Sequence, residues 1–291
     1  MIGVMTQTGA YIVFSQVGLT YGKGDEALEA LRDVSFEVAA GESVALIGPS
    51  GCGKSTTLHL LAGLLAPTEG SVLVDGEPVA APRRTTAFIQ QDLGLFPWKT
   101  VLQNASLGLM IQKVPKREAT ERARSALERV ELSEFERSYP KDLSGGMRQR
   151  LALARALAMK ADLLLMDEPL SAIDALLRES LQDDLLALWR ERGHTQMLVT
   201  HSIEEAVYLG QRIIVFSPRP ATPVAVIDNP DVGDAGYRAS AEYLAKCQEV
   251  RAALNGAGED AVEDEDGEET GSSASEGSSE MASRQAEGGA A

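Results

Sequence analysis

Short apolar runs alternate with stretches of helical periodicity along most of the chain. The run at 43–47 is apolar almost throughout and ends at Gly48, which is typical of a strand buried on both faces. Helical periodicity follows directly at 54–65 and returns at 175–190. The other predicted strands are bounded by turn residues, and they are 11–17, 34–38, 71–74, 86–89, 163–167, 197–200, 212–216 and 224–227. Strands that alternate with helices favour a doubly wound α/β core.

The segment from about residue 92 to residue 160 breaks this alternation. Residues 118–130 and 147–158 carry charged and apolar positions at helical spacing, with few β-branched runs. We therefore predict a mostly helical insertion within the α/β core. A terminal helix is predicted at 237–254, and the chain contains no internal repeat.

Composition and charge indicate that an acidic segment follows this domain. The 291 residues are 44% hydrophobic, which suffices for one sizeable α/β domain with an appendage or for two small domains. The formal net charge is −16, and residues 257–291 hold eleven acidic residues against one arginine, Arg284. Because that segment lacks aromatic residues, we predict that it is a disordered acidic tail. The rest of the chain has no clustered basic face, which argues against a nucleic-acid partner.

Targeting signals and cysteines bear on the compartment. Residues 1–10 have neither a basic start nor an apolar run long enough for a secretory signal. No stretch approaches 18 uninterrupted apolar residues, so another polypeptide must supply the spans of any membrane process. The two cysteines, Cys52 and Cys247, fit a reducing compartment rather than a disulfide framework.

A glycine-rich loop joins the strand at 43–47 to the helix at 54–65. Glycines in such a loop let backbone N–H groups turn toward phosphate oxygens, at the positive end of the following helix. We expect Lys54 to reach the β- and γ-phosphates of a nucleotide and the Ser55 hydroxyl to ligate Mg²⁺. The alternative is a glycine-rich turn that fits the pattern by chance and binds no phosphate. The motif alone also does not distinguish kinases, GTPases and transport ATPases. The loop residues match the phosphate-loop pattern at every fixed position, and they are Gly48, Pro49, Ser50, Gly51, Cys52, Gly53, Lys54 and Ser55.

Two adjacent carboxylates, Asp167 and Glu168, stand at the carboxyl end of the strand at 163–167. In an open α/β sheet, ligands bind at that edge. We expect Asp167 to hold Mg²⁺, directly or through water, and Glu168 to polarise the attacking water as general base. The alternative is a strand that ends in a solvated acidic turn, which would leave the phosphate loop without an acid to complete a metal site.

Residues 143–150 carry the sequence Leu-Ser-Gly-Gly-Met-Arg-Gln-Arg between these two sites. This resembles the signature of ATP-binding cassette (ABC) ATPases, and the resemblance covers roughly residues 11–227. Ile173 stands where the family more often has leucine. The resemblance implies roles for further residues: Tyr21 stacks on adenine, Thr56 contacts the nucleotide, Gln91 is the Q-loop glutamine near Mg²⁺, Asp174 belongs to the D-loop and His201 is the switch histidine at the γ-phosphate.

The resemblance also implies a fold and a division of the chain. The expected fold is a P-loop NTPase core with a mostly parallel sheet, an N-terminal antiparallel β subdomain and an inserted α-helical subdomain. The expected segments are an N-terminal extension at 1–10, an ABC ATPase domain at 11–230 with the helical subdomain at about 92–160, a C-terminal helix at 231–256 and the acidic tail at 257–291.

The signature has a physical interpretation of its own. Ser144, Gly145 and Gly146 precede a predicted helix, so they offer a hydroxyl and bare backbone N–H groups to an anion. The phosphate loop already holds one side of the nucleotide, so a second anion site needs a nucleotide on another copy. In the family, two cassettes lie head to tail and enclose two ATP molecules. We expect the same here, with a second ABC ATPase subunit, an identical copy, as partner and with ATP and Mg²⁺ at the interface.

Residues 95–101 and 216–220 resemble importer ATPases of the nitrate, sulfonate and taurine type. That resemblance implies a peripheral subunit on the cytoplasmic face of the inner membrane. Its partners would be transmembrane permease subunits and, indirectly, a solute-binding protein. Trp98 would contact the permease or pack locally. The alternatives are an exporter or lipoprotein-release ATPase, a soluble ABC protein of translation or DNA repair, and a P-loop kinase.

The remaining histidines receive no catalytic role. His59 lies on the helix after the phosphate loop and is interpreted as structural. His194 follows Gly193 at a predicted helix end, where a cation would favour the helix dipole. The sequence contains no paired His/Cys spacing of the kind that indicates a zinc site.

Overall fold

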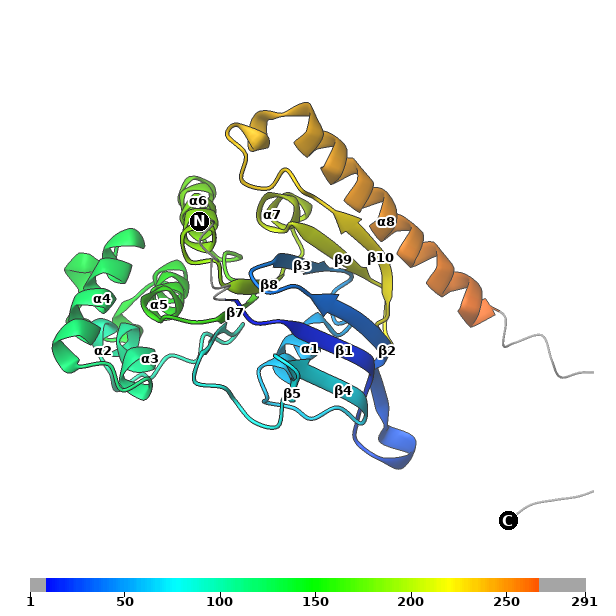
Figure 1. Cartoon of the computed structure of the whole chain (residues 1–291), viewed down its shortest axis with the longest axis horizontal. Helices are drawn as coiled ribbons and strands as arrows, with labels where there is room; N and C mark the ends of the chain where they lie inside the picture. The colour runs from blue at the N-terminus through cyan, green and yellow to red at the C-terminus, as the bar shows by residue number, and fades with distance from the viewer. Residues whose placement is uncertain (1–8, 267–291) are drawn as a thin grey trace, which may run out of the picture.

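The computed structural model describes residues 9–266 as two β-sheets with helices packed around them (Figure 1). Within these residues, the larger sheet has six strands in the order β10-β9-β3-β8-β7-β6. Neighbouring strands are parallel except β10, which runs antiparallel to β9. The strands are β3 (Ser43–Ile47), β6 (Thr86–Ile89), β7 (Leu163–Asp167), β8 (Thr195–Val199), β9 (Arg212–Phe216) and β10 (Pro223–Asp228).

The central strands separate two hydrophobic cores. Every residue of β3, β7 and β8 is buried, as their continuous apolar runs predict. Alternate side chains point to opposite faces of a strand. Accordingly, Val44 and Leu46 of β3 join one core, whereas Ala45 and Ile47 join the other.

The smaller sheet is antiparallel and covers one face of the larger sheet together with α1 (Lys54–Leu61). Its described strands have the order β2-β1-β4-β5. The ring of Phe14 on β1 stacks on that of Phe36 on β2, with centroids 4.5 Å apart. The strands are β1 (Ile12–Tyr21), β2 (Leu28–Val38), β4 (Glu69–Val74) and β5 (Glu77–Pro78).

Helices of the insertion and of the C-terminal half pack on the opposite core. The predicted helical insertion is confirmed, because α2 to α5 all lie between β6 and β7 and project to one side of the sheet in Figure 1. The α-helices are α2 (Val101–Ala105), α3 (Leu107–Ile111), α4 (Lys116–Arg129), α5 (Gly145–Ala158), α6 (Ala175–Arg192), α7 (Ile203–Leu209) and α8 (Ala241–Asp266). Short 3-10 helices are η1 (Gly24–Glu26), η2 (Ser133–Phe135), η3 (Pro140–Asp142) and η4 (Tyr237–Ala239).

The observed elements differ from the predicted ones mainly at their ends. The bounds of β3, β6, β7 and β9 are those predicted. The first helix ends at Leu61 rather than at residue 65, because Gly63 has φ +71° and its Cα faces the backbone of Ala81. The short helices α2, α3 and α7 were not predicted, since segments of five to seven residues carry too little periodicity.

The two ends of the chain depart from the predicted segments. Ala10, assigned to the N-terminal extension, is buried and accepts a hydrogen bond from the Thr195 hydroxyl. At the other end α8 starts at Ala241 and continues to Asp266, so the expected tail is helical at its beginning. Extending a packed helix avoids a new nucleation step, which explains the continuation. Residues 267–291 of the expected tail lie outside the described residues, as do residues 1–8 of the extension.

None of the described helices has both the length and the apolar character that a membrane span requires. Cys52 and Cys247 are both buried free thiols.

His194 was given no chemical role, and it is not a cation at the helix end. The side chain lies just before β8 and is only 3% exposed. Burial lowers the pKa of its imidazole to about 4, and the positive charge of Arg192 acts in the same direction. The ring is therefore neutral at physiological pH.

This burial predicts an acid-sensitive fold. Because the pKa of folded His194 lies below the ordinary value of 6.5, the unfolded chain binds the proton first as the pH falls. Folding stability is therefore lost between about pH 6.5 and pH 4, by up to about 3 kcal/mol for this residue. Chemical unfolding of the His194→Leu variant across this range should show a flatter pH dependence than the wild type. An unchanged slope would contradict the assignment.

Candidate nucleotide-binding site

The glycine-rich loop leaves β3 and enters α1, and its conformation requires glycine at two points. Gly53 has φ +132°, and a Cβ there would lie 2.7 Å from the Leu31 side chain and 2.9 Å from the Ala30 carbonyl. Gly48 packs equally closely on Phe216, whose carbonyl would be 2.9 Å from an added Cβ. The loop is therefore held between β2 and β9 with its backbone close to the sheet.

Lys54 is buried at the first position of α1. Its ammonium donates hydrogen bonds to the carbonyls of Gly48 at 2.8 Å and Pro49 at 2.7 Å. Its Nζ lies 3.7 Å from the Sγ of Cys52, which is itself buried inside the loop. The loop thus encloses the positive charge of Lys54 at the start of a helix, which is an arrangement suited to an anion.

A cleft of about 330 Å³ opens beside this loop. Tyr21, the last residue of β1, closes one side, and its hydroxyl lies 3.2 Å from that of Thr56. Gln91 follows β6 and also lines the cleft. The structure brings together here the predicted residues Tyr21, Ser50, Gly51, Gly53, Lys54, Ser55, Thr56, Gln91 and Glu168, with Leu28, Ala30, Val199 and Arg219 beside them.

Asp167 fits a divalent cation. One of its carboxylate oxygens is buried without a hydrogen-bond partner among the described residues. Burial raises the pKa of this carboxyl, whereas the Ser55 hydroxyl lowers it by hydrogen bonding. A buried carboxylate next to a hydroxyl is a ligand pair that Mg²⁺ takes, and phosphate oxygens complete such sites. No group of three His, Cys, Asp or Glu side chains suited to a metal occurs in the described part of the chain.

Glu168 is held in an unusual backbone conformation at the mouth of the cleft. Its φ is +50°, in the left-handed region that non-glycine residues rarely occupy. Its N–H donates to the Val199 carbonyl at 2.9 Å, and its carbonyl accepts from the Gln149 amide at 2.8 Å. The carboxylate lies 3.3 Å from Nδ1 of His201. Such strain persists only where surrounding contacts impose it, and it clusters at functional sites.

Similarity to known proteins agrees with this geometry. The family model described as ABC transporter matches residues 31–171. The taurine import ATP-binding protein TauB of Burkholderia pseudomallei (strain 1710b) is 48% identical over 216 residues, which cover 74% of this chain and 83% of TauB. The aliphatic sulfonates import ATP-binding protein SsuB of a Bacillus cereus strain is 40% identical over 218 residues, covering 75% of this chain and 86% of SsuB.

The chain belongs to the ABC transporter family of ATPases. Among solved structures, a dimeric structure of the ATP-binding cassette MJ0796 in a post-hydrolysis state with ADP and Pi is similar, with a TM-score of 0.69 and 33% identity. That likeness covers 75% of this chain and 98% of the other. The predicted P-loop NTPase fold, with its antiparallel and mostly parallel sheets, is thereby confirmed.

The signature residues of this ABC cassette do not line its own cleft. Ser144 caps α5 by accepting a hydrogen bond from the Met147 N–H at 3.2 Å, and it is exposed together with Gly145. Gly146 follows in the first turn of α5. Asp174, also exposed, caps α6 by accepting from the Leu177 N–H.

Two residues beside the cleft were not predicted. The Arg219 guanidinium donates to the Gly51 carbonyl through two nitrogens, at 2.6 and 3.1 Å. Gln149, buried on α5, donates to the Glu168 carbonyl and accepts from the Ala172 N–H at 2.7 Å. Arg219 belongs to the segment 216–220 and Gln149 to the signature, and both segments were noted in the sequence. Neither pattern, however, shows which of its side chains reaches the cleft.

We predict that Arg219 positions the phosphate loop. Arg219→Ala should raise the KM for ATP roughly tenfold, because a charge-assisted hydrogen-bond pair to the loop is lost, while kcat changes less. Arg219→Lys should recover part of the loss, since a single ammonium replaces the two-nitrogen contact. Steady-state ATPase assays provide the measurement, with Arg32→Gln on β2 as a control. A loss confined to kcat would contradict the prediction.

Proposed function

We propose that this chain is the ATP-hydrolysing subunit of an importer for a small solute of the nitrate, sulfonate or taurine type. The observation that carries the proposal is one cleft lined by a phosphate loop and Glu168, with Asp167 and His201 against it. The relatives named as taurine and aliphatic sulfonate import proteins support the transport role and the solute class.

Each residue around the cleft has a chemical task in this proposal. Lys54 and the N–H groups of its loop bind the phosphates of ATP, and Tyr21 stacks on the adenine. Ser55, Asp167 and Gln91 hold Mg²⁺, which neutralises charge on the phosphates when bound. Glu168 takes the proton of the attacking water, and His201 orients Glu168 and contacts the γ-phosphate.

The second half of the pocket comes from another copy of the chain. Ser144 and Gly145 are exposed at the amino end of α5, where backbone N–H groups attract an anion. They do not line the cleft of their own chain. We therefore infer a head-to-tail dimer in which the signature of each copy, with Asp174, covers the nucleotide of the other. The dimeric MJ0796 cassettes support this arrangement.

The permease supplies the membrane spans in this proposal, and the chain binds it from the cytoplasmic side of the inner membrane. Trp98 is 69% exposed and contacts Phe96 only edge-on, with ring centroids 5.3 Å apart. This exposure favours a partner contact over local packing. The exporter alternative lacks comparable support, because the similar exporter structure is 26% identical and only 42% of it is covered.

The general base can be tested directly. Glu168→Gln should lower ATP turnover by roughly 10²- to 10⁴-fold while ATP binding persists, because the amide cannot take the proton from water. In light scattering, the variant should form an ATP-dependent dimer that does not dissociate. Glu204→Gln, an exposed acid on α7, is the matched control. Hydrolysis at the normal rate by Glu168→Gln would exclude this residue as the base.

The shared pocket can be tested without disturbing the helix that carries the signature. Ser144→Asp should preserve the α5 cap, since aspartate is an equally good capping residue, but it places a carboxylate against the partner's phosphates. ATP-dependent dimerisation in the Glu168→Gln background should disappear. Thr100→Asp, at the cap of α2, should leave dimerisation intact.

Mixing two inactive variants distinguishes a pocket shared between two chains from a defect within one chain. Ser144→Asp and Lys54→Ala chains, each inactive alone, together contain one intact phosphate loop facing one intact signature. Their mixture should recover part of the ATPase activity. Absence of any recovery, with both variants folded, would contradict the two-chain pocket.

The transport role needs a measurement in cells. Deletion of the gene in its source organism should abolish uptake of labelled taurine or an alkanesulfonate. The wild-type gene, but not Glu168→Gln, should restore uptake. Unchanged uptake in the deletion strain would refute the solute class while leaving the ATPase assignment intact.

A further inference from the structure

The turn between β8 and α7 carries His201, whose imidazole has few contacts of its own. The side chain is 63% exposed, and its Nδ1 lies 3.3 Å from a carboxylate oxygen of Glu168. Within residues 9–266, no other hydrogen bond or ion pair holds the ring. The position of the imidazole therefore depends on the backbone turn from which it projects.

Glu205 closes this turn from the inside of the molecule. Its carboxylate accepts a hydrogen bond from the Thr200 hydroxyl, and that hydroxyl accepts one from the Ser202 N–H at 3.1 Å. The Ser202 hydroxyl in turn accepts from the Glu205 N–H at 3.2 Å. In an ordinary capping box the acid binds the N–H of the capping residue directly. Here the Thr200 hydroxyl stands between them, so the hydrogen bonds include both chain neighbours of His201.

The burial of Glu205 lowers the stability of the fold. Only 5% of the residue is exposed, and its second carboxylate oxygen has no hydrogen-bond partner among the described residues. Burial raises the pKa of this carboxyl, although the Thr200 hydrogen bond and the positive charge of Arg178 lower it. Helix capping does not require such burial, because Glu204 accepts from the Ser202 hydroxyl at an exposed position. The buried acid therefore calls for a reason other than the start of α7.

A small cavity places Glu205 next to the acid that His201 contacts. Its volume is about 40 Å³, and Glu168 lines both this cavity and the nucleotide cleft. Glu205 lines the cavity but not the cleft, so it acts on a nucleotide only through its neighbours. The lining residues come from two segments: Glu168, Leu170, Ser171 and Arg178 follow β7, and Thr200, His201, Ser202 and Glu205 follow β8.

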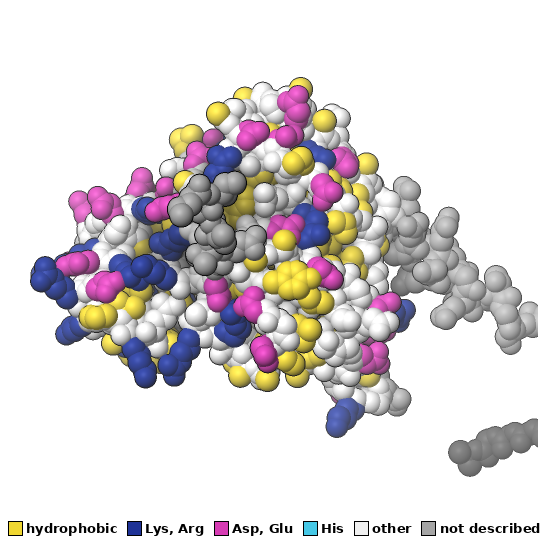
Figure 2. All heavy atoms as spheres, viewed as in Figure 1, with side chains coloured by type: hydrophobic (Ala, Val, Ile, Leu, Met, Phe, Trp, Pro, Cys, Tyr) yellow, Lys and Arg dark blue, Asp and Glu magenta, His cyan; other side chains and the backbone are white. Residues whose placement is uncertain are grey.

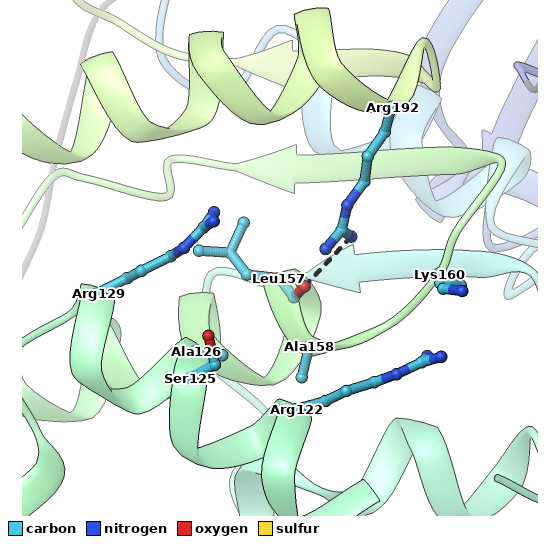
Figure 3. Close-up of a pocket in the computed structure, with 8 residues that line it drawn as sticks. All are labelled: Arg122, Ser125, Ala126, Arg129, Leu157, Ala158, Lys160 and Arg192. Atoms are coloured by element: carbon cyan, nitrogen blue, oxygen red, sulfur yellow. Dashed lines mark hydrogen bonds between the residues drawn. The ribbon is translucent and has the colours of Figure 1, made fainter. Parts of the chain in front are cut away.

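A larger cavity of about 150 Å³ shares no lining residue with the one beside Glu205. It is lined by residues of α4 and the end of α6, and Figure 2 shows Lys and Arg side chains gathered where α4 lies in Figure 1. Figure 3 draws Arg129 and Lys160 at opposite ends of this larger cavity. These cations do not enclose a single point, whereas hydrogen bonds join the residues around Glu205.

We propose that Glu205 is a positioning residue for His201. Through Thr200 it fixes the turn that carries the histidine, and so it holds the imidazole against Glu168. This inference rests on the role proposed above for His201 at the γ-phosphate. Because Glu205 does not line the nucleotide cleft, its loss affects hydrolysis more than the binding of ATP.

Steady-state ATPase assays of the full chain test this role. Glu205→Ala should lower kcat roughly 10- to 100-fold and leave the KM for ATP nearly unchanged, because small displacements of a positioned group cost rates of this order. Thr200→Val removes only the hydroxyl from a side chain of the same shape and should give a similar loss. Thr200→Ser keeps the hydroxyl and should retain most of the wild-type rate. Glu204→Gln, at the exposed neighbouring position, is the matched control.

A double-mutant cycle distinguishes positioning from a general loss of structure. In a His201→Ala background, Glu205→Ala and Thr200→Val should each lower kcat by less than about twofold, because the group that they position is already absent. A residue that only stabilised the fold would lower activity by the same factor in both backgrounds. Thermal unfolding shows which variants are folded at the assay temperature. If Glu205→Ala does not fold, the cycle with Thr200→Val decides the question.

The outcomes separate this proposal from the function on which it rests. Wild-type kcat in both Glu205→Ala and Thr200→Val, with His201→Ala impaired, would overturn the positioning role alone. Losses that multiply with that of His201→Ala would also overturn it, because Glu205 would then act by another route. Normal hydrolysis by His201→Ala would remove the proposed role of the histidine and this inference with it.

Discussion

The parallel register of three neighbouring strands is the constraint on which the site depends. Val199 at the end of β8 is paired with Leu46 of β3 on one side and with Asp167 of β7 on the other. The carboxyl ends of β3, β8 and β7 therefore lie side by side at one edge of the sheet. The glycine-rich loop, the acid pair and His201 follow directly after this common row, although more than a hundred residues separate the first from the last. Parallel strands place their carboxyl ends together, and this makes the edge a ligand site.

Local contacts then fix the reactive groups at that edge. Gln149 reaches from α5 to the Glu168 carbonyl and to the Ala172 N–H, so one buried amide connects the signature helix to the residues after the acid pair. The same contacts hold Glu168 in its left-handed conformation. A displacement of α5 would therefore act on Glu168 directly. Such a connection gives a physical route between the exposed signature and the cleft beside the glycine-rich loop.

Polar contacts hold both ends of the helix α5. Ser144 caps its amino end, and the carbonyls of Leu157 and Met159 near its carboxyl end accept hydrogen bonds from Arg192. Both ends are thus matched to the helix dipole, with an anion expected at the first and cations placed at the second. The inserted helical subdomain is attached to the core through these polar contacts as well as through its apolar face.

The sequence by itself determined the elements and chemistry that depend on local pattern. The apolar runs predicted the central strands, and the phosphate loop and the acid pair were located from glycine spacing and from the end of a buried strand. The roles proposed for the side chains nearest the cleft came from those motifs and from the family resemblance, and they stay predictions. Tertiary structure alone decided the contacts between segments remote in sequence. Arg219 against Gly51, Gln149 against Glu168 and the neutral burial of His194 all depend on packing, which no periodicity within a single segment records.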